Sequence, residues 1–291
     1  MEDAEANLSI IGPDAEQYTD ARFYLGITKA QLRKADESIE ILENLLKGIL
    51  SDKKRGDFAD RISLQLAYAH TKKYTDKEFA VAEKILDRLT SNEYPVDLIL
   101  QAKSLQAFLY SVMAGYSKLE EKKSEFIRKA FKIGEEIVKN PRSTPAVRFE
   151  ALNALGIAWM RFADKSQQQS AIGEAAGAWE KAEYYFKEAL SIIPNSVRVL
   201  QNLGTLRLLQ LNKGIANDPS MLLREAKQFV QRSLEVNDQD QFPFYQLAQI
   251  AVAEKDRANA FKYIREGRSR PGAVQEKSWT KVESAAQSLP T

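Results

Sequence analysis

A pattern of small and apolar residues that recurs along the chain constrains its fold more than any other feature. In its clearest copy, the sequence reads Leu155-Gly156, then Ala182, Phe186 and Ala189, and then Pro194. Steps of four and three residues, as between Ala182, Phe186 and Ala189, place side chains on one face of an α-helix. A pattern that returns at intervals of tens of residues predicts stacked helix pairs, in which each pair packs on its neighbours.

Five further copies share this arrangement. In each, a dipeptide that begins with Leu lies in one segment, and three small or apolar residues at helical spacing lie in the next. They are Leu25-Gly26 with Ser38, Leu42 and Leu45; Leu66-Ala67 with Ala82, Leu86 and Leu89; Leu105-Gln106 with Ala130, Gly134 and Ile137; Leu203-Gly204 with Ala226, Val230 and Ser233; and Leu247-Ala248 with Ala260, Ile264 and Gly267. Small side chains let two helices approach closely, and large apolar ones fill the space between layers. The sequence therefore predicts six helix pairs.

The clearest copy resembles the tetratricopeptide repeat (TPR), whose Leu-Gly, Ala-x-x-x-Phe and closing Pro are matched at Leu155-Gly156, Ala182, Phe186 and Pro194. The resemblance covers roughly residues 19 to 272. It implies an all-α fold, a TPR-like right-handed α-solenoid of about six antiparallel helix pairs with a C-terminal capping helix. The expected segments are an acidic N-terminal segment at 1–18, the repeat array as one domain at 19–272, and the capping helix at 273–291.

The copies are longer than the family's repeat. The small residues that open the second helices lie at 38, 82, 130, 182, 226 and 260, so their intervals are 44, 48, 52, 44 and 34 residues, against about 34 for the family. The extra residues fall mostly in 112–124, 164–174 and 212–219. Either the helices are longer than usual, or connecting loops project along one edge of the stack.

Charge is balanced overall and uneven locally. The net charge is +2, from 42 basic and 40 acidic residues, so no global field attracts nucleic acid or an anionic membrane. Residues 1–20 carry six acids and no base, whereas Lys262 to Arg270 is a basic cluster. A solvated helix face is the preferred interpretation of the cluster, and a phosphate, nucleic-acid or acidic-peptide site is the alternative. No nucleic-acid partner is expected.

The chain contains no cysteine, which removes disulfides, thiolate metal sites and cysteine nucleophiles. The sequence shows no signal peptide, and no segment approaches the 18 or more apolar residues of a membrane span. A cytoplasmic location is the expectation.

Catalytic arrangements are scarce. His70 is the only histidine, and its place on the inward face of a predicted helix favours a structural role over a pH-sensitive or catalytic one. There is no Gly-rich phosphate-binding loop of the Gly-x-x-x-x-Gly-Lys-Ser/Thr type. The sequence therefore predicts no catalytic residue, no metal site and no cofactor, and a protein that is not an enzyme.

In tetratricopeptide arrays the first helix of each pair lines a concave face that binds partners. By this resemblance, seven residues of the last three copies are predicted to line a partner-binding groove: Asn153, Arg161, Arg198, Gln201, Asn202, Tyr245 and Gln249. Amide side chains both donate and accept hydrogen bonds and can pair with a peptide backbone, while arginine can hold a carboxylate. Ordinary polar surface is the alternative interpretation.

The family's carboxylate clamp for chaperone tails is not matched. It uses Lys and Asn on one first helix, Asn on the next, and Lys with Arg on the third. Asn202 fits the middle position, but Asn153 and Ile157 replace the first two residues, and Phe242 and Gln246 replace the last two. The resemblance therefore argues against a role in binding these tails.

In the first three copies the corresponding positions are apolar or aromatic: Phe23, Ile27, Leu64, Tyr68, Leu100 and Tyr110. These side chains either pack between long helices or bind an apolar helix. The chain's own Leu8, Ile10 and Ile11 form one candidate for such a helix.

The leading functional hypothesis is a non-enzymatic protein–protein interaction scaffold or adaptor that binds a peptide or partner protein on its concave groove. The alternatives are a regulatory module that senses a small ligand or peptide and controls an associated effector, and an enzyme or nucleic-acid binder that uses the Lys262 to Arg270 cluster.

Overall fold

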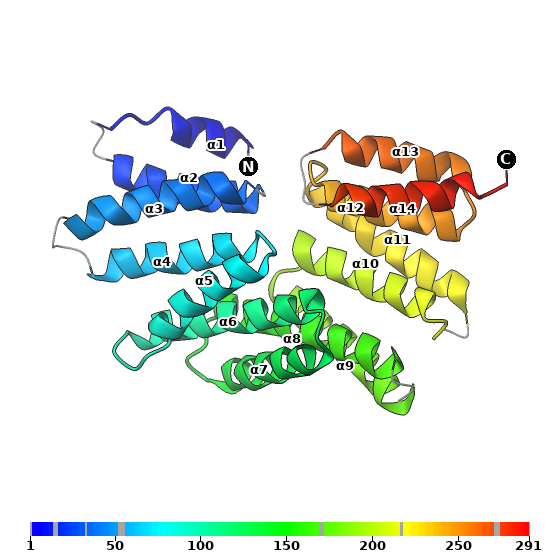
Figure 1. Cartoon of the computed structure of the whole chain (residues 1–291), viewed down its shortest axis with the longest axis horizontal. Coiled ribbons are helices and arrows are strands. Elements are labelled where there is room, and N and C mark those ends of the chain that lie inside the picture. Colours follow the sequence, from blue (N-terminus) through cyan, green and yellow to red (C-terminus); the bar gives the residue numbers. More distant parts are fainter. Residues whose placement is uncertain are drawn as a thin grey trace. The chain divides into compact units, whose positions relative to one another are not determined.

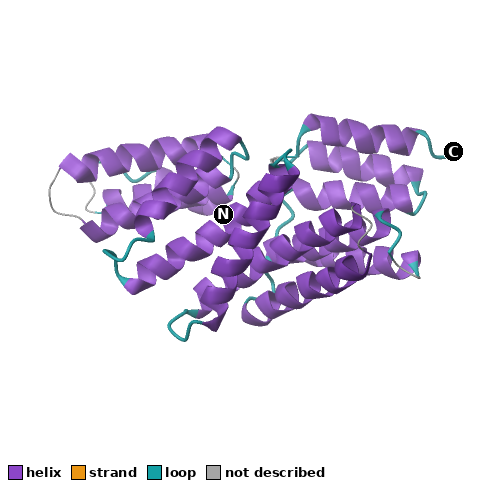
Figure 2. Ribbon diagram, turned by 60° about the horizontal axis from the view of Figure 1, so that its bottom comes forward, coloured by secondary structure: helices purple, strands orange, loops and turns teal. Residues whose placement is uncertain are grey.

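Helices account for all the regular secondary structure in the described part of the chain. The computed structural model describes residues 2–13, 17–32, 34–51, 56–168, 172–215, 218–270 and 274–290. It contains fourteen helices and, within these ranges, no strand (Figure 2). The all-α prediction is therefore confirmed for the described residues.

The internal contacts divide the chain into two compact units, Met1–Ala154 and Leu155–Thr291. The first contains α1 (Glu2–Ser9), α2 (Tyr18–Gln31), α3 (Ala35–Ser51), α4 (Gly56–Thr71), α5 (Asp76–Leu89), α6 (Val96–Tyr116) and α7 (Glu120–Lys139). The division falls inside α8 (Pro145–Gln168), and the second unit continues with α9 (Ile172–Ile192), α10 (Val197–Asn212), α11 (Pro219–Val236), α12 (Gln241–Ala253), α13 (Arg257–Arg268) and α14 (Glu276–Gln287) (Figure 1). The segments predicted at 1–18, 19–272 and 273–291 are not tested by this division and stay predictions.

Each predicted copy corresponds to one pair of consecutive helices, and the pairs are α2/α3, α4/α5, α6/α7, α8/α9, α10/α11 and α12/α13. The small residues that the pattern places in the second helices are completely buried, with 0% exposure at Ser38, Ala82, Ala130, Ala182, Ala226 and Ala260. Several lie inside the helix and not at its start, as Ala182 does in α9 (Ile172–Ile192). A β-carbon added to Gly156 would come within 2.5 Å of the Phe186 ring, and one added to Gly204 within 2.8 Å of Val230. The paired helices therefore meet where the sequence pattern places its small residues.

Within each unit, the first helices of successive pairs lie side by side. Helix α4 contacts both α2 and α6 in the first unit, and α12 contacts both α10 and α14 in the second. Each of these helices also packs against the second helix of its own pair and of the preceding pair, as α4 does against α5 and α3. The first helices thus form a continuous row inside each unit, and one face of every such helix is left for other contacts.

Longer helices, rather than projecting loops, explain most of the extra length. Helices α6, α7, α8 and α9 have 21, 20, 24 and 21 residues, and only residues 117–119 separate α6 from α7. In the fifth copy the connection 213–218 lies between α10 and α11; residues 216–217 are outside the described part. The long-helix interpretation is therefore correct for the third and fourth copies.

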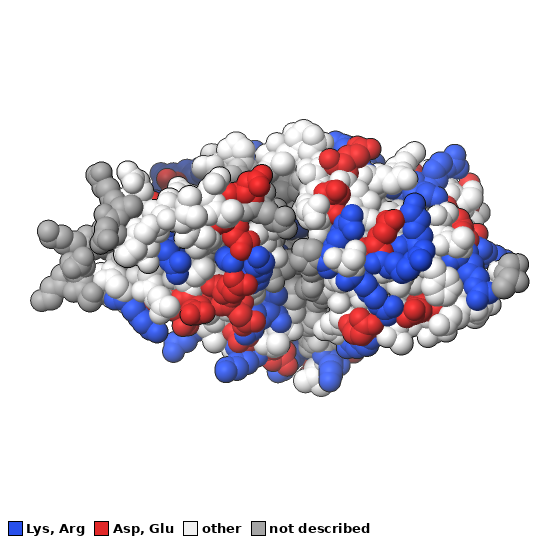
Figure 3. Space-filling model, turned by 90° about the horizontal axis from the view of Figure 1, so that it is seen from above, with Lys and Arg blue, Asp and Glu red and all other residues white. Residues whose placement is uncertain are grey.

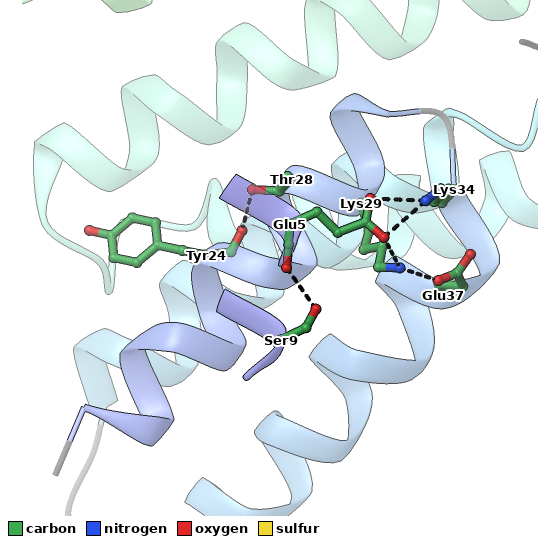
Figure 4. A network of polar contacts seen from close by, with 7 residues as sticks. All are labelled: Glu5, Ser9, Tyr24, Thr28, Lys29, Lys34 and Glu37. Carbon is green, nitrogen blue, oxygen red and sulfur yellow. Dashed lines mark hydrogen bonds and ion pairs between the residues drawn. The ribbon is translucent and has the colours of Figure 1, made fainter. Parts of the chain in front are cut away.

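The amino-terminal segment packs on the first repeat through ion pairs. Figure 4 shows Glu5 of α1 between two lysines, with its carboxylate 2.5 Å from Lys29 Nζ and 2.9 Å from Lys34 Nζ. Lys29 also pairs with Glu37 of α3. The hydrogen bonds from Lys29 and Lys34 hold the pKa of Glu5 below its ordinary value. Helix α1 is thereby fixed against α2, whereas Ile10 just beyond it is 81% exposed.

The last helix closes the second unit. Trp279 of α14 is 0% exposed and packs in one cluster with Phe244 of α12 and Ile264 of α13. Gly267 of α13 lies directly against the Trp279 ring, so a side chain there would exclude the indole. Helix α14 covers the apolar side of the last helix pair, as a terminal helix of a repeat stack is expected to do.

The contact at Gly156 predicts a specific loss of stability. We expect Gly156→Ala to lower the free energy of unfolding by about 1 kcal/mol or more, because the added methyl group overlaps the buried Phe186 ring. Gly177→Ala is the matched control, since a β-carbon there meets nothing within 4 Å, and it should raise stability by about 0.5–1 kcal/mol through helix propensity. Urea unfolding followed by circular dichroism measures both. Equal effects of the two substitutions would show that the α8 and α9 backbones are not in close contact.

Candidate functional site

Two stripes of half-buried side chains run along neighbouring first helices of the second unit. Helix α10 contributes Arg198, Asn202, Thr205 and Leu209, and α12 contributes Phe242, Tyr245, Gln249 and Val252. Members of each stripe are three or four positions apart and therefore share a helix face. Because α10 and α12 pack against each other, the eight residues form one partly accessible surface, here called the α10–α12 surface.

The seven predicted groove residues are divided between the α10–α12 surface, helix α8 and the buried interior. Arg198, Asn202, Tyr245 and Gln249 lie on the α10–α12 surface, and Arg161 is half-buried on α8. Gln201 is 6% exposed and Asn153 0% exposed, so the helix packing covers both side chains. Asn153 also belongs to the Met1–Ala154 unit, whereas the other six belong to Leu155–Thr291.

A ladder of buried amides joins α10 to α12. Gln246, 1% exposed, donates from Nε2 to the Gln201 backbone oxygen at 2.8 Å and to Thr205 Oγ1 at 3.0 Å. Gln201 donates from Nε2 to Asp240 Oδ2 at 2.8 Å, and the other Asp240 oxygen caps α12 by accepting from the Phe242 amide at 3.1 Å. Buried polar groups of this kind strongly favour the one arrangement that satisfies them. The ladder therefore sets how the two stripes lie relative to each other.

Tyr245 links the surface to the terminal helix. Its ring meets Trp279 edge to face with centroids 5.3 Å apart, and its hydroxyl accepts from Gln249 Nε2 at 3.3 Å. Burial raises the pKa of the Tyr245 phenol, and a hydrogen bond with Ser278 opposes this only partly. The phenol therefore stays protonated at neutral pH and can donate a hydrogen bond. The supporting role of Trp279 could not be read from the repeat pattern, because α14 lies outside the helix pairs.

A buried arginine joins three helices behind the surface. Arg207 of α10, 7% exposed, lies 2.7 Å from Glu183 of α9 and 2.6 Å from Glu225 of α11. Burial raises the pKa of Glu183, but the hydrogen bonds from Arg207 and Lys187 outweigh it and hold the value below the ordinary 4.5. The Arg207 guanidinium thus pairs with two carboxylates on successive second helices, α9 and α11. Arg207 therefore has a structural role.

Part of the basic cluster near the carboxyl end is engaged in packing. Arg268 pairs with Glu276 and Glu283 of α14 at 2.7 and 2.9 Å. Arg270 donates to the Asp238 backbone oxygen at 2.6 Å and lies 4.3 Å from the centre of the Phe244 ring. Basic side chains gather on the right-hand part of the face drawn in Figure 3, which belongs to the Leu155–Thr291 unit. Arg268 and Arg270 therefore help to hold α14 and the start of α12.

His70 has the structural role favoured by the sequence. It is 7% exposed, and its Nδ1 lies 2.5 Å from Glu78 Oε2 on α5. Lys73 lies 3.5 Å from the other Glu78 oxygen and 2.6 Å from Asp36 of α3. The cluster thus ties the first repeat to the second.

The described residues form neither a cluster of metal ligands nor a membrane-spanning helix. Among the described residues there is no group of three or more His, Asp or Glu side chains placed to hold a metal ion. The helices in the described ranges include none whose length and apolar character would let it cross a membrane.

Comparison with known proteins gives structural likenesses only. No protein-family model matches the chain, and no curated protein matches it. Eighteen solved chains match its structure. A monomeric mutant of IFIT1 with m7Gppp-AAAA is similar over 94% of this chain and 75% of its own, at 11% identity and a TM-score of 0.45. The complex of the TPR2AB domain of yeast Sti1 with pHSP90 is similar over 94% of this chain and 100% of its own, at 15% identity and a TM-score of 0.31. Likeness of this extent assigns no function.

The Arg207 cluster predicts a loss of stability in acid. Because the pKa of Glu183 is lowered on folding, its contribution is present above the ordinary pKa and is lost as pH falls through the folded value. We expect Glu183→Gln to destabilise the protein by about 1–2 kcal/mol at pH 7 and to change stability less at pH 3. Glu188→Gln, at an exposed position of the same helix, is the control. Urea unfolding at both pH values measures this, and a pH-independent effect of Glu183→Gln would contradict the ion-pair account.

Proposed function

We propose that the chain is a non-enzymatic scaffold or adaptor that binds a peptide or partner protein on the α10–α12 surface. The observation that carries this proposal is the pair of accessible stripes on adjacent first helices, held in place by the buried Gln246 and Gln201 ladder. A rigid surface with fixed donors and acceptors loses little conformational freedom on binding, which favours affinity. A cytoplasmic location remains part of the proposal.

The chemistry of the stripes suits a polypeptide ligand. Asn202 and Gln249 can each donate to and accept from a peptide group, and Arg198 can pair with a carboxylate. Tyr245 and Phe242 add aromatic area, which is enriched at the centre of protein interfaces. In this proposal Gln201 supports the surface from within, and Arg161 and Asn153 stay as predictions outside it.

The proposal is tested by comparing two double variants in quantitative affinity purification from the source cell. We expect Arg198→Ala with Asn202→Ala to lower the recovery of specific partners at least tenfold, which corresponds to about 1.4 kcal/mol of lost binding free energy. Gln228→Ala with Gln231→Ala is the matched control, because both residues are exposed on α11 and face away from the first-helix row. It should retain the wild-type partners.

Thermal unfolding of both variants establishes that the helix packing is intact. Full partner recovery with folded Arg198→Ala/Asn202→Ala would contradict the assignment of the α10–α12 surface.

A further inference from the structure

The first unit carries a second accessible face, on α4. Arg61, Gln65 and Tyr68 lie on one side of α4, at steps of four and three residues. Lys72 is four residues further on, directly after the last residue of α4, and its amide still donates to the Tyr68 backbone oxygen at 3.3 Å. Arg61 is exposed, and the other three are half-buried. These four residues are here called the α4 face.

Both cations of the α4 face rest on aromatic rings instead of carboxylates. The Arg61 guanidinium carbon lies 5.5 Å from the centre of the Phe23 ring and 5.9 Å from that of Phe58. The Lys72 ammonium lies 4.9 Å from the Tyr68 ring and 5.3 Å from the Phe108 ring. Such contacts orient a cation and leave its N–H groups able to bind an anion.

Neither cation makes an ion pair with any residue that the structure describes. Nearby lysines behave differently, since Lys73 pairs with Asp36 at 2.6 Å and Lys103 with Glu136 at 2.5 Å. Two positive charges on one accessible face therefore lack the negative partners that neighbouring lysines have. This is the charge pattern of a surface that is complementary to an acidic ligand.

The two cations lie over different seams between the first helices. Phe23 belongs to α2 and Phe108 to α6, so Arg61 lies at the α2–α4 seam and Lys72 at the α4–α6 seam. Eleven positions separate them, about 16 Å at the helical rise of 1.5 Å per residue. Side chains four positions apart in an extended peptide point to the same side and start about 13 Å apart, and the flexible glutamate side chains can reach the remaining distance. Gln65 stands between the cations, and among the described residues it makes no hydrogen bond.

We propose that the α4 face binds an extended acidic peptide whose two carboxylates are about four residues apart. One carboxylate pairs with Arg61 and the other with Lys72, and the Gln65 amide pairs with a peptide group between them. The proposal rests on the proposed function in that it assumes a peptide-binding scaffold, but it uses a different surface and names the chemistry of the ligand.

An acidic peptide fits this face better than a nucleic acid does. Single-stranded nucleic acids gain much of their affinity by stacking bases on aromatic side chains. Phe23 and Phe108 are only 3% and 5% exposed, so the packing and the cations themselves cover these rings. The Tyr68 ring is half-buried, with the Lys72 ammonium 4.9 Å from its centre. The remaining accessible groups are the charged and amide N–H donors, which match carboxylates and peptide carbonyls.

The test is fluorescence anisotropy of the full chain with synthetic peptides. The probe is a fluorescein-labelled extended peptide with two glutamates four positions apart, and the matched probe has glutamine in both places. We expect the glutamate probe to bind and to bind more weakly as salt rises, and the glutamine probe to bind at least tenfold more weakly. A third probe with adjacent glutamates should also be weaker, because it cannot reach both cations.

Arg61→Gln with Lys72→Gln should weaken binding of the glutamate probe at least tenfold. Lys47→Gln with Lys84→Gln removes the same charge at exposed positions of α3 and α5 and should leave the affinity within twofold. Thermal unfolding checks that both variants fold. No binding of the glutamate probe, equal binding of all three probes, or unchanged affinity of Arg61→Gln/Lys72→Gln would overturn the proposal.

Two further arms separate this proposal from its alternatives. A labelled oligouridine that binds more tightly than the glutamate probe, and loses binding in Arg61→Gln/Lys72→Gln, would assign the face to nucleic acid instead. Arg198→Ala/Asn202→Ala should leave binding of the glutamate probe unchanged. The α4 face and the α10–α12 surface can therefore fail independently.

Discussion

The close approach of the two helices in each pair is the constraint on which the rest of the structure depends. It requires a side chain of minimal size where the helices meet, as at Gly156 against Phe186 and at Ala182, which is 0% exposed. Interiors packed at crystal-like density tolerate little extra volume. Once the pairs are closed in this way, their first helices come to lie next to one another, as α10 and α12 do. The accessible faces of those helices are the candidate binding surfaces.

Polar residues of the first helices have two distinct roles: some are buried and fix the helix packing, and others are partly accessible. Gln246 and Arg207 are buried and donate hydrogen bonds to partners on neighbouring helices, so they hold successive helices in register. Asn202 and Gln249 are partly accessible on the adjacent faces. In the first unit the α4 face differs, because Arg61 and Lys72 are held by aromatic rings. The two units thus present surfaces of different chemistry on the same type of scaffold.

The fold was predictable to the level of individual pairs, because close helix contacts require small residues and these recur at recognisable positions in the sequence. Gly26, Gly156, Gly204 and Gly267 each lie against a large side chain of a neighbouring helix. The site was less predictable than the fold.

Gln201 and Asn202 are adjacent in sequence and point about 100° apart around the helix axis, so the rotation of α10 about its axis decides which side chain is buried. The periodicity does not fix that rotation, since it depends on packing with α12. In the first three copies, Phe23, Leu64, Leu100 and Tyr110 are buried, so the packing interpretation is correct for them. Helix α1 packs on α2, a contact that depends on Glu5 and that no repeat pattern encodes.

Residue-resolved amide hydrogen exchange tests most directly the claim that close pairing organises the structure. If paired helices are locked together at their small residues, the most protected amides of α8 and α9 should surround Gly156 and Ala182 and share one free energy of opening. The same should hold for α10 and α11 around Gly204 and Ala226. Protection confined to the first helices, with the second helices exchanging as fast as isolated peptides, would contradict the account.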